Sequence, residues 1–323
     1  MTFLTVLGWL AAALFLLAAF FVGYFVLVTR RIAADAERRV PASGKFVDVG
    51  GNRIHYVETG EGRPILFVHG LGGQLHHFRH PLFPAIGPGY RLIALDRPGS
   101  GYSARARGAT ARLTEQADVI AGFIAALGLE KPLLVGHSLG GAVTLAVALN
   151  HPDAISGIVL LAPLTHMEES VRAEFKGLYI KSPLKRWLLA NTVAVPTSLK
   201  YAPQTLDFVF GPQKWPEDYI IKGGGMVGLR PSHFYGTASD TVAIELDLGQ
   251  LQARYGEIKM PAGMMFGTAD RVLDHKLHGL SMQGRIEGLE LEMVEGLGHM
   301  LPFMATERAA ALIRRIADRA FAA

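Results

Sequence analysis

Residues 133–141 read LLVGHSLGG, and this stretch decides how the rest of the chain is interpreted. Residues 132–135 form a short apolar run that predicts a buried strand, and residues 142–150 predict a helix. Between them, residues 136–140 match G-x-S-x-G, in which a tight strand-to-helix turn exposes the hydroxyl of a strained serine. A β-carbon at Gly136 or Gly140 would collide with the neighbouring strand or helix. We therefore expect Ser138 to be a nucleophile.

The five-residue pattern is weak evidence by itself, so composition and context must support it. The chain has 323 residues, half of them hydrophobic, which suits one large domain with appendages. The absence of cysteine excludes disulfides, thiolate zinc sites and a cysteine nucleophile. The formal charge of +4 comes largely from basic residues beside one apolar segment, so we expect no nucleic-acid partner.

That apolar segment runs from Phe3 to Val28 without a charged residue. Its length is enough to cross a hydrocarbon core of roughly 30 Å with some tilt. No basic residue precedes it and arginines follow it, which favours a transmembrane helix over a cleaved signal peptide or a buried soluble helix. We expect residues 1–30 to be a single-pass membrane anchor and residues 31–44 a linker. The basic flank, which includes Arg30 and Arg31, predicts that the following domain lies on the cytoplasmic side.

Residues 45–164 predict a mostly parallel α/β sheet. Residues 45–49 and 53–58 alternate apolar and polar side chains around Gly50-Gly51-Asn52, which predicts a hairpin. Continuous apolar runs at 64–68, 91–95, 133–135 and 158–161 predict strands that are covered on both faces, and residues 113–127 predict an amphipathic helix. Loops rich in glycine and polar residues follow these strands, so a ligand site is expected at the carboxyl edge of the sheet.

The alternation of strands and helices breaks after Leu164 and returns near residue 246. Residues 165–245 carry scattered aromatic residues and prolines, with a helical stretch at 171–189, and they predict an inserted, mostly helical cap. Residues 246–323 predict the second part of the core, with strands at 264–266 and 289–294 and a closing helix from 306 to about 321. The expected fold is therefore a sheet flanked by helices, with a cap and an N-terminal anchor.

A serine hydroxyl needs a histidine to accept its proton and a carboxylate to hold that histidine in the correct tautomer. Ser138, Asp270 and His299 occur in the order that this fold requires, and each follows a predicted strand. The alternatives are that His299 only caps the final helix, or that Asp274 or the more distant Asp240 supplies the carboxylate. Asp274 instead has the position of a helix N-cap, so we expect Asp270 to be the acid.

Acyl transfer also requires donors directed at the developing oxyanion. We expect these to be the backbone N–H groups of Leu139, which begins the helix, and Leu71, which lies in the loop after His69-Gly70. His76, His77 and His80 resemble a metal cluster, but no H-E-x-x-H pattern or carboxylate accompanies them, so we expect no metal and no cofactor. Asp96, Arg97 and Pro98 are expected to be structural. Three methionines with nearby aromatic residues line either an apolar pocket beneath the cap or an ordinary core: Met226, Met300 and Met304.

The motifs FVHGLGG, DRPGSGYS, VGHSLGG, GTAD and GLGH occur in this order from residue 67 onward. Together they resemble the α/β-hydrolase superfamily from about residue 45 to the end. A serine at the elbow is unlike haloalkane dehalogenases and epoxide hydrolases, whose nucleophile is an aspartate. The resemblance implies a carboxylic-ester hydrolase, with thioesterase, carbon–carbon bond hydrolase and cofactor-free perhydrolase as alternatives.

An anchor ahead of this domain is similar to membrane-bound monoacylglycerol lipases, which suits an apolar or lipid-derived ester. We therefore interpret the chain as a membrane-anchored serine hydrolase that cleaves such an ester through an acyl-enzyme. A non-catalytic ligand receptor or scaffold on the same fold is the alternative from another class, because such relatives can keep an intact triad. The sequence makes no prediction of the oligomeric state.

Overall fold

The computed structural model describes residues 2–168 and 172–322. Its centre is one eight-stranded sheet in the order β1-β2-β4-β3-β5-β6-β7-β8. Strands β3 to β8 run parallel to one another, and the β1–β2 hairpin joins them with β2 antiparallel to β4. The strands are β1 Lys45–Val49, β2 Asn52–Thr59, β3 Arg63–Val68, β4 Tyr90–Leu95, β5 Leu133–His137, β6 Gly157–Leu161, β7 Ala262–Gly267 and β8 Glu290–Val294. The prediction of a mostly parallel sheet behind an N-terminal hairpin is confirmed.

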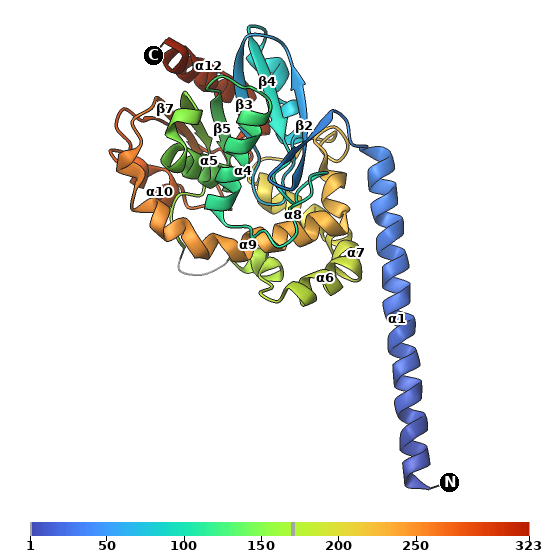
Figure 1. Cartoon of the computed structure of the whole chain (residues 1–323). Helices are drawn as coiled ribbons and strands as arrows, with labels where there is room; N and C mark the ends of the chain where they lie inside the picture. The colour runs from blue at the N-terminus through green and yellow to red at the C-terminus, as the bar shows by residue number, and fades with distance from the viewer. Residues whose placement is uncertain (1, 169–171, 323) are drawn as a thin grey trace.

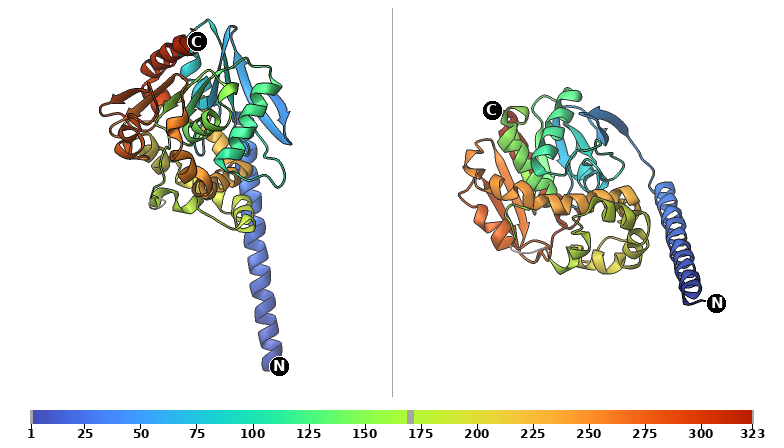
Figure 2. Two further views of the ribbon diagram at one scale, coloured as in Figure 1. Left: turned by 60° about the vertical axis from the view of Figure 1, so that its left-hand side comes forward. Right: turned by 60° about the horizontal axis from the view of Figure 1, so that its bottom comes forward.

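The apolar strands of the sheet are buried because helices cover both of its faces. Every residue of β5, β6 and β7 is buried, as expected of continuous apolar runs in a parallel sheet. Helices α3 and α12 pack together on one face, and α4 and α5 pack together on the other (Figures 1 and 2). The core helices are α2 His76–Arg79, α3 Leu82–Ile86, α4 Leu113–Ala126, α5 Leu139–Asn150, α10 His275–His278, α11 Leu301–Met304 and α12 Thr306–Ala322.

The cap consists of helices inserted between β6 and β7. They are α6 Pro183–Asn191, α7 Ala194–Lys200, α8 Ala202–Phe210 and α9 Pro231–Gln252. Figure 1 shows α9 running between the core and α6. The prediction of one helical stretch over residues 171–189 was wrong in its extent. The structure has a 3-10 helix at Ala173–Leu178 followed by the separate helix α6. Residue 171 lies outside the described residues. Proline at 183 lacks an N–H and fits only a first turn, with Ser182 as its N-cap.

The expected end of the cap at residue 245 falls inside α9. This helix continues to Gln252 because Leu248 and Leu251 are buried in the main hydrophobic core. Its last two turns therefore pack on the core, beside α4 and α5. One helix thus belongs to both units, and its last turns fix the end of the cap on the core.

Helix α1 Phe3–Arg39 extends away from the rest of the molecule (Figures 1 and 2). It is long and apolar enough to cross a membrane by length and composition, and its most apolar window has no buried residue. The helix continues through most of the expected linker, to Arg39. Its last turns are not free, because Thr29, Ala33 and Ala36 are buried against the cap. These turns contribute to a small second core: Ala36, Val40, Val195, Met226, Val227 and Leu229.

Candidate active site

Ser138 occupies a strained turn between β5 and α5. Its φ of 54° and ψ of −123° lie in a region that residues other than glycine rarely adopt. The turn can be this tight because glycines occupy the neighbouring positions, where there is no room for a side chain. A β-carbon at Gly140 would lie 2.1 Å from the carbonyl oxygen of Val68, and one at Gly136 would lie 2.4 Å from Oγ1 of Thr144. The sequence therefore folds into a nucleophile elbow at this point.

His299 and Asp270 form a pair at the same edge of the sheet. Asp270 follows β7 and His299 follows β8, so both leave the carboxyl ends of parallel strands. The Nδ1 atom of His299 lies 2.7 Å from Oδ2 of Asp270, and both side chains are almost completely buried. Oδ1 of the same carboxylate accepts hydrogen bonds from the backbone N–H groups of Val272 and Leu273. This carboxylate is therefore fixed in position and holds the imidazole with Nε2 free.

The residue before Ser138 brings this pair beside the elbow. The rings of His137 and His299 have centroids 4.9 Å apart, and Nε2 of His137 donates to the carbonyl oxygen of His299 over 3.1 Å. Burial lowers the pKa of His137 well below its usual value, so its ring is neutral. In the described part of the chain, no hydrogen bond joins the Ser138 hydroxyl to the His299 ring. Such bonds often tighten only when substrate is bound.

Two backbone N–H groups lie near Ser138 without an acceptor. The backbone nitrogen of Leu139 is at the first turn of α5, and that of Leu71 follows Gly70 after β3. Neither nitrogen donates to any atom of residues 2–168 and 172–322. The loop approaches the elbow so closely that a β-carbon at Gly70 would lie 2.8 Å from Cβ of Ser138. Two N–H groups beside a serine, both without an acceptor among the described residues, are the arrangement that an oxyanion site would need.

Comparisons with known proteins agree with this geometry. A family model described as the alpha/beta hydrolase fold matches residues 63–193. The chain has the α/β-hydrolase fold, and the comparisons support a hydrolase of that superfamily. The chain is 26% identical to a 2-hydroxy-6-oxo-6-phenylhexa-2,4-dienoate hydrolase of Burkholderia cepacia. The aligned region covers 80% of this chain and 90% of that hydrolase.

Solved structures share the fold of this hydrolase. A membrane phospholipase A described as a bacterial virulence factor has a TM-score of 0.68 at 24% identity, covering 97% of this chain and 98% of that one. An esterase from Exiguobacterium antarcticum has a TM-score of 0.65 at 23% identity, covering 85% of this chain and 100% of that one. The homologues and structural neighbours that support the assignment are hydrolases.

The other two carboxylates considered from the sequence have different partners in this hydrolase. Asp274 caps α10 by accepting from the backbone N–H of Lys276, as its position predicts. Asp240 is buried on α9 of the cap, where it forms ion pairs of 2.7 Å with Arg97 and 2.6 Å with Arg105. Neither carboxylate contacts His299, which leaves Asp270 as its partner.

Sequence reasoning missed the part that Arg97 plays. Its side chain is completely buried and donates to the carbonyl oxygens of His69 and Gly70, to Gln116 and to Asp240. Arg97 thus holds the loop that carries Leu71 and ties that loop to the cap. The available signal was an arginine that lies two residues after a buried strand. An arginine buried at such a place requires a partner for its charge. The partner itself lies 143 positions away in the sequence, so the pattern does not identify it.

The histidines after β3 connect the core of the hydrolase to the cap. Nε2 of His77 lies 3.0 Å from the hydroxyl of Tyr219, and Nε2 of His80 lies 3.1 Å from Oδ2 of Asp218. Burial lowers the pKa of His77 to about 3, and that of His76 to about 4. No group of three or more side chains suited to a metal ion occurs among the described residues.

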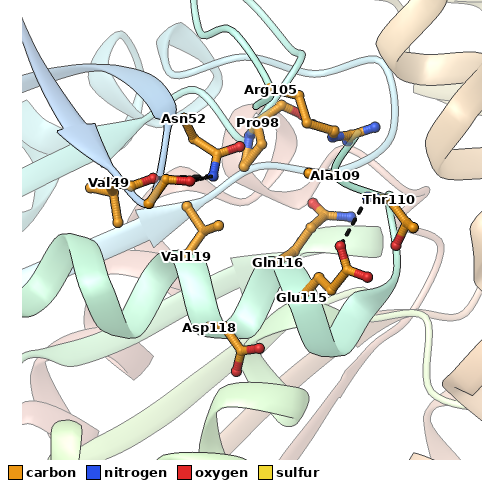
Figure 3. A pocket seen from close by; sticks show the side chains of 11 residues that line it. Val49, Asn52, Pro98, Arg105, Ala109, Thr110, Glu115, Gln116, Asp118 and Val119 are labelled. Carbon is orange, nitrogen blue, oxygen red and sulfur yellow. Dashed lines mark hydrogen bonds between the residues drawn. The ribbon is translucent and has the colours of Figure 1, made fainter. Parts of the chain in front are cut away.

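The methionines near the cap pack in two separate clusters. Met226 lies against the end of α1, and Met300 packs with Phe210 and Tyr219. A cavity of about 270 Å³ lies elsewhere, between the β1–β2 turn and α4 (Figure 3). Its lining contains none of the triad residues. It consists of Val49, Gly50, Asn52, Pro98, Arg105, Ala109, Thr110, Glu115, Gln116, Asp118 and Val119.

Proposed function

We propose that this α/β-hydrolase is a membrane-anchored serine esterase that cleaves an apolar or lipid-derived carboxylic ester. The observation that carries the proposal is the strained Ser138 beside two backbone N–H groups without acceptors, at the sheet edge that also holds the His299–Asp270 pair. A nucleophile, a base with its orienting acid, and an oxyanion site are the parts that acyl transfer needs.

In the proposed reaction, the Ser138 hydroxyl attacks the ester carbonyl while Nε2 of His299 accepts its proton. The N–H groups of Leu71 and Leu139 stabilise the oxyanion of the tetrahedral intermediate, and each such donor is typically worth about 3 to 4 kcal/mol. The imidazolium, stabilised by Asp270, then protonates the leaving alcohol. Water activated by the same histidine attacks the acyl-enzyme, which releases the acid and restores the serine.

The membrane part of the proposal rests on α1. Its run from Phe3 to Val28 is charge-free and its flank is basic, which favours an anchor with the hydrolase domain on the cytoplasmic side. The structural neighbour described as a membrane phospholipase A aligns with 97% of this chain. We further propose the division into anchor 1–30, linker 31–44, core 45–164 and 246–323, and an intervening cap, with the shared helix α9 at its boundary.

A carbon–carbon bond hydrolase is the second candidate. It is favoured by two curated relatives, both named as hydrolases of 2-hydroxy-6-oxo dienoic acids, that are 26% identical over 80% and 82% of this chain. The arrangement of Ser138, Asp270 and His299 does not separate the two substrates, so the distinction requires a direct assay.

The experiment is a substrate panel with the full-length protein in detergent. We expect p-nitrophenyl esters from acetyl to palmitoyl to turn over, with a maximum at one chain length that reports the depth of the acyl site. Preferred cleavage of a 2-hydroxy-6-oxo dienoate or a thioester would replace the ester assignment. A single turnover with retained ligand would instead favour the receptor alternative.

A further inference from the structure

Helices α6 and α7 of the cap expose large apolar side chains. Leu184 is 66% exposed and Trp187 is 56% exposed, although leucine and tryptophan side chains are usually largely buried in folded domains. We call this set the docking surface, and it consists of Leu184, Trp187, Leu188, Leu199 and Tyr201. The opposite side of α6 is anchored in the protein, because Arg186 and Ala190 are buried and the Arg186 guanidinium lies over the Tyr235 ring of α9. Helix α6 is therefore amphipathic with its apolar side open.

The docking surface lies level with the end of the apolar segment of α1. Thr29, the first residue after Val28, donates its hydroxyl to the carbonyl oxygen of Thr192, which directly follows α6. Helices α6 and α7 both contact α1. Figure 1 shows α6 and α7 at the edge of the molecule from which α1 extends. A bilayer around residues 3–28 would therefore have its surface at the height of α6.

The charge around the docking surface suits anionic headgroups. Residues 181–201 contain no Asp or Glu and four basic residues, Lys181, Lys185, Arg186 and Lys200. Two of these four are already engaged, because Arg186 is buried over Tyr235 and Lys181 pairs with Glu245. Lys185 and Lys200 are exposed and form no ion pair within the described residues. Arg30 and Arg31 on α1 are exposed at the same level. Basic side chains beside Trp and Leu are the composition of helices that lie in a membrane interface.

We propose that the docking surface inserts into the headgroup and upper acyl region of an anionic lipid leaflet, so that the cap rests on the membrane. The inference depends on the proposed anchor in α1 but not on the substrate. It follows from the exposed apolar side of α6, its level relative to residue 28, and the basic residues beside it. The membrane would then hold the cap in one orientation, and helix α9, which joins the cap to the core, would pass that orientation to the core.

Depth-dependent fluorescence quenching tests this proposal, because the chain has three tryptophans and one lies in the docking surface. Two full-length variants each keep one informative tryptophan. Trp9→Phe with Trp215→Phe keeps Trp187, and Trp187→Phe with Trp215→Phe keeps Trp9 in the apolar segment. Both are reconstituted in vesicles of phosphatidylcholine and phosphatidylglycerol that contain lipids brominated either near the headgroup or near the chain end.

We expect lipids brominated near the headgroup to quench Trp187 at least about twofold more than lipids brominated near the chain end. Quenched Trp9 with unquenched Trp187 would overturn the docking proposal and leave the anchor intact. If that Trp187 also emits at short wavelength, another copy of the chain covers the surface instead. Unquenched Trp9 would remove the anchor and the docking proposal together.

A matched pair of variants gives a second readout. Leu188 is 45% exposed in the docking surface, and Leu280 is 43% exposed on the core. Leu188→Ser, made in the variant that keeps Trp187, should weaken the quenching of Trp187 by lipids brominated near the headgroup, whereas Leu280→Ser in the same background should not change it. Both should keep wild-type turnover of a water-soluble short-chain ester. Equal effects of the two substitutions would contradict a specific surface.

Discussion

Oδ2 of Asp270 lies 2.7 Å from Nδ1 of His299, while Oδ1 accepts two backbone N–H groups. Both oxygens of this carboxylate are thus held by hydrogen bonds that the fold directs. Asp270→Asn should reduce turnover by about 10⁴-fold with little change in structure, because an amide that donates to Nδ1 favours the wrong imidazole tautomer. The measurement is kcat on a p-nitrophenyl ester, with circular dichroism as the folding control.

Asp274 provides the matched control for that substitution. Its carboxylate caps α10 and contacts no ring of the triad. Asp274→Asn should leave kcat within about threefold, and it should cost less than about 1 kcal/mol in stability because asparagine is also a good N-cap. If this variant lost as much turnover as Asp270→Asn, the assignment of the acid would be wrong.

Gly140 should be the glycine least tolerant of a methyl group in the elbow. The added carbon would lie 2.1 Å from a backbone oxygen of β3, which is too rigid to move aside. Gly140→Ala should lower the free energy of unfolding by about 3 kcal/mol or more and abolish turnover. Gly177→Ala, where nothing lies within 4 Å, should change the melting temperature little. Similar melting temperatures for both variants would refute this packing.

The buried ion pairs of Asp240 should stabilise the join between core and cap. Asp240→Asn leaves the guanidinium of Arg97 buried without its counter-charge, so we expect a loss of about 3 to 5 kcal/mol in denaturant unfolding. Glu257→Gln is the control, because Glu257 pairs with Arg254 at the solvent-screened surface and its loss should leave denaturant unfolding nearly unchanged. A loss below that of the control would show that the pairs do not hold the cap.

Buried neutral histidines should make the protein less stable in acid. Burial lowers the pKa of His77 to about 3, whereas the unfolded chain binds this proton below about pH 6.5. The free energy of unfolding should therefore fall as pH drops from 6.5 toward 3. His77→Gln should flatten that slope by up to about 1.4 kcal/mol per pH unit between pH 6 and 4. An unchanged slope would show that His77 is protonated in the folded protein.

The sequence predicted the sheet well because its signals are local. The apolar run at 132–135 and the glycines at 136 and 140 report burial and steric exclusion at their own positions. The candidate site residues Ser138, Asp270 and His299 were chosen from the same local signals, since each follows such a strand, and their roles remain a prediction.

The cap was harder to predict because its helices pack on distant partners. Pro183 divides an otherwise helical stretch, and Leu248 and Leu251 extend α9 by packing on the core. The pairing of Arg97 with Asp240 and the packing of α1 on Met226 both join segments far apart in the chain. Composition and periodicity contain no information about such contacts.

The most direct test of the account is Ser138→Ala in the full-length protein, assayed on the preferred p-nitrophenyl ester beside labelling with a fluorophosphonate. Ser138 lies in a strained turn, a feature that gathers at functional sites, and its replacement by alanine removes only the hydroxyl oxygen. We predict that turnover falls by at least about 10⁴-fold and that labelling disappears, while the melting temperature is kept. If the variant retained most of its turnover, or were still labelled, the serine mechanism would be contradicted.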